Sequence, residues 1–255
     1  MIQSQDKNRM PEIPEEMLEH IHQLDEAIPL TLQNNYFRQS TLIRKKMFKV
    51  TPDYITEAKQ ILENSESIDT AILMDYLSHL AIGGNIEALR LIESFVPEQP
   101  GVLRQWALMA QLEARLGVLS ELIDEKQIAI SSGLGGHNGL MRMEALIYHQ
   151  ALEPFKEYEK KLIMDEFGLI VEQQKGEIEK INFGENYAVL FFLLPFKNDI
   201  KAVFEKLAYQ CNQYGNFLSP KFMVTNTEHI SKTEIDKMLA AYRKENIDNN
   251  NIKTT

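Results

Sequence analysis

The amino-acid sequence predicts an α+β protein in which a helical N-terminal domain precedes a ferredoxin-like domain of β-α-β-β-α-β order. Up to about residue 125, apolar residues recur every three or four positions, and from residue 126 they begin to alternate, as they do in strands. In addition, Pro-Phe-Lys occurs at 154–156 and again at 195–197, each time between a strand-like and a helix-like segment. We therefore predict domains at 1–125 and 126–245, followed by a disordered tail at 246–255.

The N-terminal segments have the spacing and the end signals of short helices. Thr51 before Pro52 is a good cap, as is Ser67 or Asp69 further on, and Gly117 is expected to end a helix. The predicted helices are 17–28, 31–48, 52–62, 67–82, 86–95 and 102–116. Short helices joined by short turns favour a HEAT- or TPR-like shape, although no fixed repeat length is present.

The second domain is predicted from alternating segments that flank two helices. The strands are expected at 140–149, 177–183, 187–194 and 217–224, with a further extended stretch at 169–171. The helices are expected at 154–167 and 198–214, on one face of the sheet, with a last helix at 232–244. Each of the first two is expected to end at an aromatic-Gly pair, Phe167-Gly168 and Tyr214-Gly215.

One pairing stays open at this point. Segment 127–132 also alternates, and a hairpin between it and 140–149 would compete with 217–224 for one side of the same strand. Either 127–132 lies at an edge or the fold is a variant. Strand 187–194 is apolar throughout, so we expect it to be covered on both faces.

Composition and charge exclude several classes of protein. The chain has 255 residues, 44% of them apolar and 25% charged, as in ordinary globular proteins. The single cysteine, Cys211, excludes an intramolecular disulfide and a cysteine-based zinc site. The longest apolar run, 187–195, is far shorter than the roughly 20 residues that span a bilayer. Since residues 1–16 lack a signal-peptide pattern, we expect a cytoplasmic protein without a membrane span.

A glycine-rich loop at 133–139 is the first candidate site. It holds a third of the 12 glycines of the chain, which suggests that its backbone closely approaches a ligand or a partner. The dinucleotide and P-loop patterns are both absent, and the alternative is a long turn without a ligand. The candidate contact residues are Ser131, Ser132, Gly133, Gly135, Gly136, His137, Asn138 and Arg142.

A basic segment is the second candidate site. Residues 27–52 contain five cations and no acid, a local charge of +5, whereas the whole chain carries −10 and the rest therefore −15. Such a segment can bind an acidic partner, and the alternative is a helix face exposed to water. The cations are Arg38, Arg44, Lys45, Lys46 and Lys49.

No catalytic, metal or cofactor site is predicted. His20 and His22 lie on opposite sides of a helix, and no activated serine or cysteine is recognisable. Segment 185–192 only partly matches the aromatic octet of RNA-recognition domains, with Glu185 where a basic residue is needed. Together with the net charge of −10, this mismatch predicts no nucleic-acid partner.

The sequence therefore favours a non-enzymatic interaction or adaptor protein that binds another protein through its helical domain and its glycine-rich loop. An exposed sheet edge would also allow a homodimer. The alternative is a small-molecule sensor with a ferredoxin-like ligand domain. A third class, an enzyme, has no nucleophile–base pair to support it.

Overall fold

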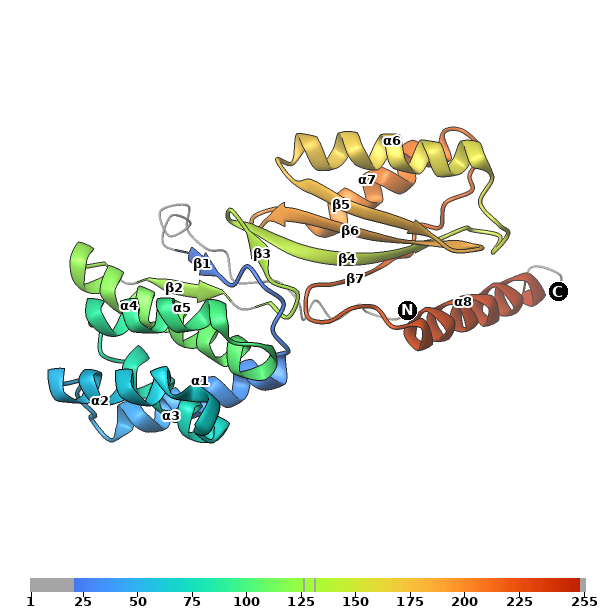
Figure 1. The fold of residues 1–255 in the computed structure, drawn as a ribbon. Coiled ribbons are helices and arrows are strands. Elements are labelled where there is room, and N and C mark those ends of the chain that lie inside the picture. Colours follow the sequence, from blue (N-terminus) through green and yellow to red (C-terminus); the bar gives the residue numbers. More distant parts are fainter. Residues whose placement is uncertain (1–20, 126, 131, 253–255) are drawn as a thin grey trace. The chain divides into compact units, whose positions relative to one another are not determined.

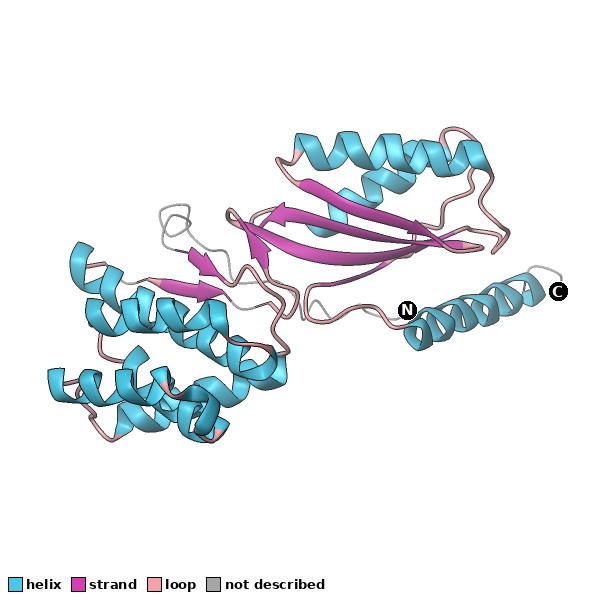
Figure 2. Cartoon of the chain, viewed as in Figure 1, coloured by secondary structure: helices cyan, strands magenta, loops and turns pink. Residues whose placement is uncertain are grey.

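The computed structural model describes residues 21–125, 127–130 and 132–252 (Figure 1). Over these residues the protein is mixed α+β, with a helical N-terminal region and an antiparallel sheet (Figure 2). It divides into two compact units. The helical unit comprises 21–23 and 32–130, and the sheet unit comprises 24–31 and the described residues from 132 onward. The predicted α+β class is thus confirmed, whereas the HEAT- or TPR-like and ferredoxin-like labels and the predicted boundaries stay predictions.

The helical unit is built from helices with well-defined ends. They are α1 (Leu30–Lys45), α2 (Pro52–Glu63), α3 (Thr70–Ala81), α4 (Ile86–Phe95) and α5 (Gly101–Ile123). Thr51 Oγ1 accepts a hydrogen bond from the backbone N–H of Tyr54, and Asp69 Oδ1 accepts one from Ala71. Both side chains therefore satisfy donors that the first helical turn leaves free, as their sequence positions predict.

The structure corrects three expectations in this unit. Residues 21–23 form strand β1 (Ile21–Gln23) instead of helix, and β1 pairs in parallel with β2 (Ile128–Ile130). Residues 128–130 therefore form neither a hairpin with β4 nor an edge of the main sheet. Helix α5 continues through Gly117 because a glycine inside a helix costs only about 1 kcal/mol. At Gly117 the missing Cβ also permits a close approach, since it would lie 3.1 Å from the Gly84 Cα.

A hydrogen-bond network centred on one carboxylate joins α1 to α5. Tyr36, Ser40 and Arg44 follow one another at four-residue steps, so they lie on the same face of α1. Tyr36 Oη donates to Glu113 Oε2 at 2.6 Å, and Ser40 Oγ donates to Oε1 at 2.5 Å. Arg44 Nη2 reaches the same Oε1 at 2.7 Å. Burial of Tyr36 and the nearby Glu113 charge hold the pKa of this phenol well above its usual value.

The sheet unit contains one antiparallel sheet with helices before and after its strands. In chain order its elements are β3 (Gly136–His137), β4 (Leu140–Tyr148), α6 (Glu157–Gln173), β5 (Glu177–Phe183), β6 (Tyr187–Pro195), α7 (Ile200–Asn212), β7 (Met223–Thr225) and α8 (Lys232–Ile252). The strand order is β3-β4-β6-β5, and β7 also pairs with β4. The longest pairing is between β4 and β6, from Leu140 opposite Pro195 to Tyr148 opposite Tyr187.

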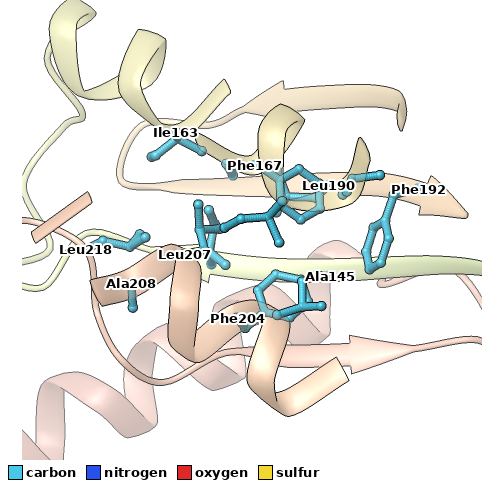
Figure 3. Close-up of a cluster of buried hydrophobic side chains, with 14 of the residues drawn as sticks. Ala145, Ile163, Phe167, Leu190, Phe192, Phe204, Leu207, Ala208 and Leu218 are labelled. Carbon is cyan, nitrogen blue, oxygen red and sulfur yellow. The ribbon is translucent and has the colours of Figure 1, made fainter. Parts of the chain in front are cut away.

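Alternation along β4 and β6 separates two apolar layers. Ala145, Leu190 and Phe192 point to the face that α6 and α7 cover (Figure 3). Leu146 and Val189 point to the opposite face and pack against α8. Helices α6 and α7 therefore lie on one face of the sheet, as expected. Strand β6 is covered on both faces, also as expected.

Three boundaries in the sheet unit differ from those expected. Helix α6 runs through Gly168 to Gln173, so 169–171 is helical instead of extended. Strand β7 is limited to Met223–Thr225. Helix α8 continues to Ile252, through most of the segment predicted to be a disordered tail. Gly168 lies inside α6 and does not have the positive φ of a glycine that ends a helix. A Cβ there would meet no atom within 4 Å apart from the backbone of α6 itself.

The network on α1 gives a test of the helical unit. Replacing Glu113 by Ala would leave the buried hydroxyls of Tyr36 and Ser40 without their acceptor. We expect Glu113→Ala to lower the free energy of unfolding by about 3 kcal/mol. Denaturant unfolding followed by the fluorescence of Trp106, the single tryptophan, measures this loss.

Glu93 is the matched control, because it also pairs with an arginine, Arg115, at 3.0 Å but lies exposed. Glu93→Ala should change the same free energy by no more than about 0.5 kcal/mol. Equal losses for Glu93→Ala and Glu113→Ala would show that the Glu113 network does not stabilise the unit.

Candidate functional site

The glycine-rich loop is packed inside the sheet unit. Residues 132–136 are all buried, whereas Asn138 and Gly139 at the tip are exposed. Asn138 and Gly139 both have positive φ, of 53° and 75°, as a tight turn before β4 requires. Ser131, also a predicted contact residue, lies outside the described residues.

The glycines of this loop allow close contact with the protein's own backbone. A Cβ at Gly133 would overlap the carbonyl oxygen of Thr227, and one at Gly135 would lie 2.8 Å from the carbonyl oxygen of Asp25. Next to Gly133, the Leu134 N–H donates to the Asn226 carbonyl at 3.2 Å. The close approach inferred from the glycine content therefore occurs, and the groups approached belong to the same unit.

The charged residue predicted beside the loop also has internal partners. The Arg142 guanidinium reaches both carboxylate oxygens of Glu179 through Nε at 2.9 Å. Its Nη1 donates to the Leu134 carbonyl at 2.9 Å. Arg142 thus anchors the loop to β5. To bind an anionic ligand, the Arg142 guanidinium would have to leave Glu179.

Two further predicted contact residues behave in the same way. His137 Nε2 lies 3.0 Å from Glu177 Oε2, and Ser132 Oγ donates to the Gly135 carbonyl at 3.0 Å. That the loop binds a ligand or a partner stays a prediction. In the structure, its side chains contact other residues of the sheet unit.

The sheet carries one charged pair that sequence reasoning missed. Glu144 lies on β4 with only 3% of its side chain exposed, and its Oε2 is 2.8 Å from His229 Nδ1. The imidazole itself is 68% exposed. Because the two residues are 85 positions apart, no local pattern connects them. The pair ties the segment that precedes α8 to the sheet and supplies the partner that a buried carboxylate needs.

The basic segment of the helical unit separates into one arginine with a partner and several free cations. Arg44 is paired with Glu113, so its charge is neutralised within the unit. Arg38, Lys45, Lys46 and Lys49 are exposed. Over the described ranges 21–125, 127–130 and 132–252, none of these four forms an ion pair. Three free lysines thus lie close together at the last residue of α1 and in the turn that follows it, here called the basic turn (residues 45–49).

An aromatic cluster adjoins the basic turn. Phe48 lies between Lys46 and Lys49, and its ring packs edge-on against Tyr54 of α2 and His79 of α3, with centroids 4.9 and 4.6 Å apart. The Tyr54 ring is stacked on Tyr76 of α3 at 5.5 Å and 15°. We call Phe48, Tyr54, Tyr76 and His79 the aromatic cluster. All four side chains are partly exposed.

The solved structures that resemble part of the chain do so weakly, and two transposases are among them. No family model and no curated protein matches the chain. A crystal structure of a candidate transposase from Deinococcus radiodurans R1 is 14% identical and covers 43% of this chain and 93% of its own, with a TM-score of 0.32. A REP-associated tyrosine transposase bound to a REP hairpin is 11% identical and covers 35% of this chain and 58% of its own, with a TM-score of 0.29. Likenesses of this size assign no activity to the chain.

These neighbours nevertheless correct several sequence-based predictions. The protein-binding adaptor, with the sensor built on a ferredoxin-like ligand domain as its alternative, conflicts with structures that are described as transposases. The prediction that no nucleic acid is bound conflicts with a neighbour that is bound to a hairpin. Those predictions are wrong, and the protein-partner and homodimer expectations that accompanied them are not carried further.

In the part of the chain that the structure describes, no three His, Cys, Asp or Glu side chains are grouped so that they could hold a metal ion. Among the helices described, none is both long and apolar enough to cross a bilayer.

The packing of the glycine-rich loop gives a second test. Gly133→Ala forces a Cβ into the Thr227 carbonyl, and we expect it to lower the free energy of unfolding by about 3 kcal/mol. Gly168→Ala is the control, because a Cβ there meets no atom within 4 Å apart from the backbone of α6 itself, and it should raise the same free energy by about 0.5–1 kcal/mol. Thermal melts of the full chain measure both. An unchanged melt for Gly133→Ala would contradict the observed packing.

The single thiol gives a third test. Burial first, and then the Glu166 charge, raises the pKa of Cys211 to about 12. At pH 8 only about one molecule in ten thousand then carries the reactive thiolate. We expect alkylation by iodoacetamide to be at least about 100-fold slower in the folded protein than in denaturant. Fast labelling of the folded chain would show that Cys211 is accessible and ionised.

Proposed function

We propose that the helical unit binds nucleic acid and that the lysines of the basic turn contact its phosphates. One observation carries the proposal: Lys45, Lys46 and Lys49 are exposed within five residues, and in the structure described none has a carboxylate partner. A lysine ammonium is a compact point charge on a flexible stem and is well suited to phosphate oxygens. Nucleic acid supplies such oxygens at close and regular spacing.

Arg44 shows why the free lysines matter. Glu113 neutralises Arg44, so that cation contributes to the fold of the helical unit. The lysines that follow it are not neutralised, and their field acts over the Debye length of about 8 Å at physiological salt. The next acid along the chain is Asp53, beyond the basic turn. A phosphate near the turn can therefore reach three lysine charges that no carboxylate among the described residues pairs with, although the whole chain is acidic.

The acidity of the chain limits the affinity. Outside 27–52 the net charge is −15, which repels nucleic acid from the other surfaces. We therefore expect sequence-independent dissociation constants of about 10⁻⁴–10⁻⁶ M near physiological salt.

We also infer a fold subclass for the sheet unit. The chain order β4-α6-β5-β6-α7-β7 and the strand order β7-β4-β6-β5 support a ferredoxin-like arrangement. This subclass hosts many unrelated functions, so it adds nothing to the functional argument.

The salt dependence of binding tests the function. We expect a labelled single strand of about 16 nucleotides to bind with a slope of log K against log salt near −2, because three phosphate contacts each contribute about 0.7. The triple variant Lys45→Gln, Lys46→Gln, Lys49→Gln should bind more weakly, with a slope close to zero. Fluorescence anisotropy across a salt series measures the affinity and the slope together.

A second triple variant controls for net charge. Lys59→Gln, Arg90→Gln and Lys161→Gln remove the same charge from exposed positions elsewhere and should leave the affinity and the slope unchanged. Equal losses in the two triple variants would overturn the assignment to the basic turn. A poly-glutamate peptide that binds as tightly as the DNA strand would show that the turn takes anionic proteins, which also overturns the proposal.

A further inference from the structure

The aromatic cluster adds to the basic turn a property that charge alone does not provide. Phe48 belongs to the turn itself, and its ring contacts Tyr54 and His79. The rings of α2 and α3 are thereby held next to the free lysines. Flat aromatic rings at a surface can stack with nucleic-acid bases, and this contact tolerates any sequence because every base has a π-face.

The two tyrosines of the cluster present neutral rings. Burial, and then the charges of Asp75 and neighbouring groups, raise the pKa of Tyr54 above its ordinary value. A hydrogen bond to Glu57 is the main cause that raises the pKa of Tyr76, whose Oη lies 2.5 Å from Glu57 Oε1. Both phenols therefore stay protonated at neutral pH, and neither adds a negative charge beside the lysines.

We infer that the basic turn and the aromatic cluster together form a site for single-stranded nucleic acid, in which phosphates lie along the lysines and bases stack on the rings. This inference rests on the proposed function. A duplex keeps its bases paired and stacked inside, so it can offer the site phosphates but not free base faces. The cluster should therefore favour single strands over duplexes.

The acidic side chains beside the cluster constrain how a strand can lie. Glu57 bonds to Tyr76, and Asp75 lies 3.3 Å from His79. These carboxylates repel phosphate at the tyrosine end of the cluster. The phosphate backbone is therefore confined to the side of Lys45, Lys46 and Lys49, and only bases can reach toward α3.

An abasic strand tests the inference on the unmodified protein. It carries the same number of phosphates as an oligothymidine of equal length but no bases. Stacking is worth about 1–3 kcal/mol per base, so loss of stacking should weaken binding at least about fivefold. We expect the oligothymidine to bind at least about fivefold more tightly than both the abasic strand and a hairpin duplex. Equal binding of all three would overturn the single-strand inference and leave the proposed function standing.

Substitutions then locate the stacking surface. Phe48→Leu and Tyr76→Leu keep apolar volume but remove the flat rings, and each should weaken oligothymidine binding at least about fivefold without changing duplex binding. Tyr209→Leu with Tyr214→Leu is the matched control, because these side chains are 67% and 66% exposed on the sheet unit, outside the site. An equal loss in this control would overturn the assignment to the cluster.

The remaining outcomes separate the two proposals. Absence of binding of the wild-type chain to any of the three probes would overturn the proposed function and this inference together. Trp106 fluorescence reports whether Phe48→Leu and Tyr76→Leu remain folded, because the indole Nε1 donates to the Met74 carbonyl and to Ser78 Oγ, both at 3.0 Å. If Phe48→Leu unfolds, Tyr76→Leu and the abasic strand still decide the question.

Discussion

Strand β6 has an apolar side chain at nearly every position, and this constrains the whole sheet unit. A strand with one face in water would alternate, so β6 needs apolar cover on both sides. Helices α6 and α7 cover the face of Leu190 and Phe192, and α8 covers the face of Val189. The pairing of β6 with β4 along nine residues places it inside the sheet. The glycine-rich loop, which precedes β4, is packed within the same unit. Residues 132–136 are buried there, so only the tip of the loop is exposed to a ligand.

In the helical unit, the fold and the candidate site draw on the same run of cations. Glu113 accepts hydrogen bonds from Tyr36 and Ser40 and pairs with Arg44, and it thereby fixes the end of α1 against α5. Arg44 stays exposed, but its charge is paired, whereas the lysines of the basic turn that follows it have no carboxylate partner among the described residues.

Local signals in the sequence predict most helices and strands. They fail where a contact between residues far apart in the sequence determines the local structure. The caps at Thr51 and Asp69 are local: the sequence predicts the first, and it offers Asp69 as one of two caps for α3, the other being Ser67. The parallel pairing of Ile21 with Ile128 spans more than 100 residues, and apolar spacing alone made 17–28 look helical. Glycine commonly ends a helix, so the sequence predicts an end at Gly117, whereas here the close approach to Gly84 favours glycine inside the helix.

The candidate site was predictable only in its charged half. The lysines of the basic turn are neighbours in the sequence, but His79 contacts Phe48, and Tyr76 contacts Tyr54, only because α3 packs against α2 and the turn. The net charge of the whole chain argues against nucleic acid. The charge of −15, however, belongs to residues outside 27–52 and not to the basic turn. It repels a polyanion from the other surfaces and leaves the basic turn as the favourable approach. Acidity elsewhere in the chain is therefore compatible with phosphate binding, provided that the free lysines stay together and without carboxylate partners.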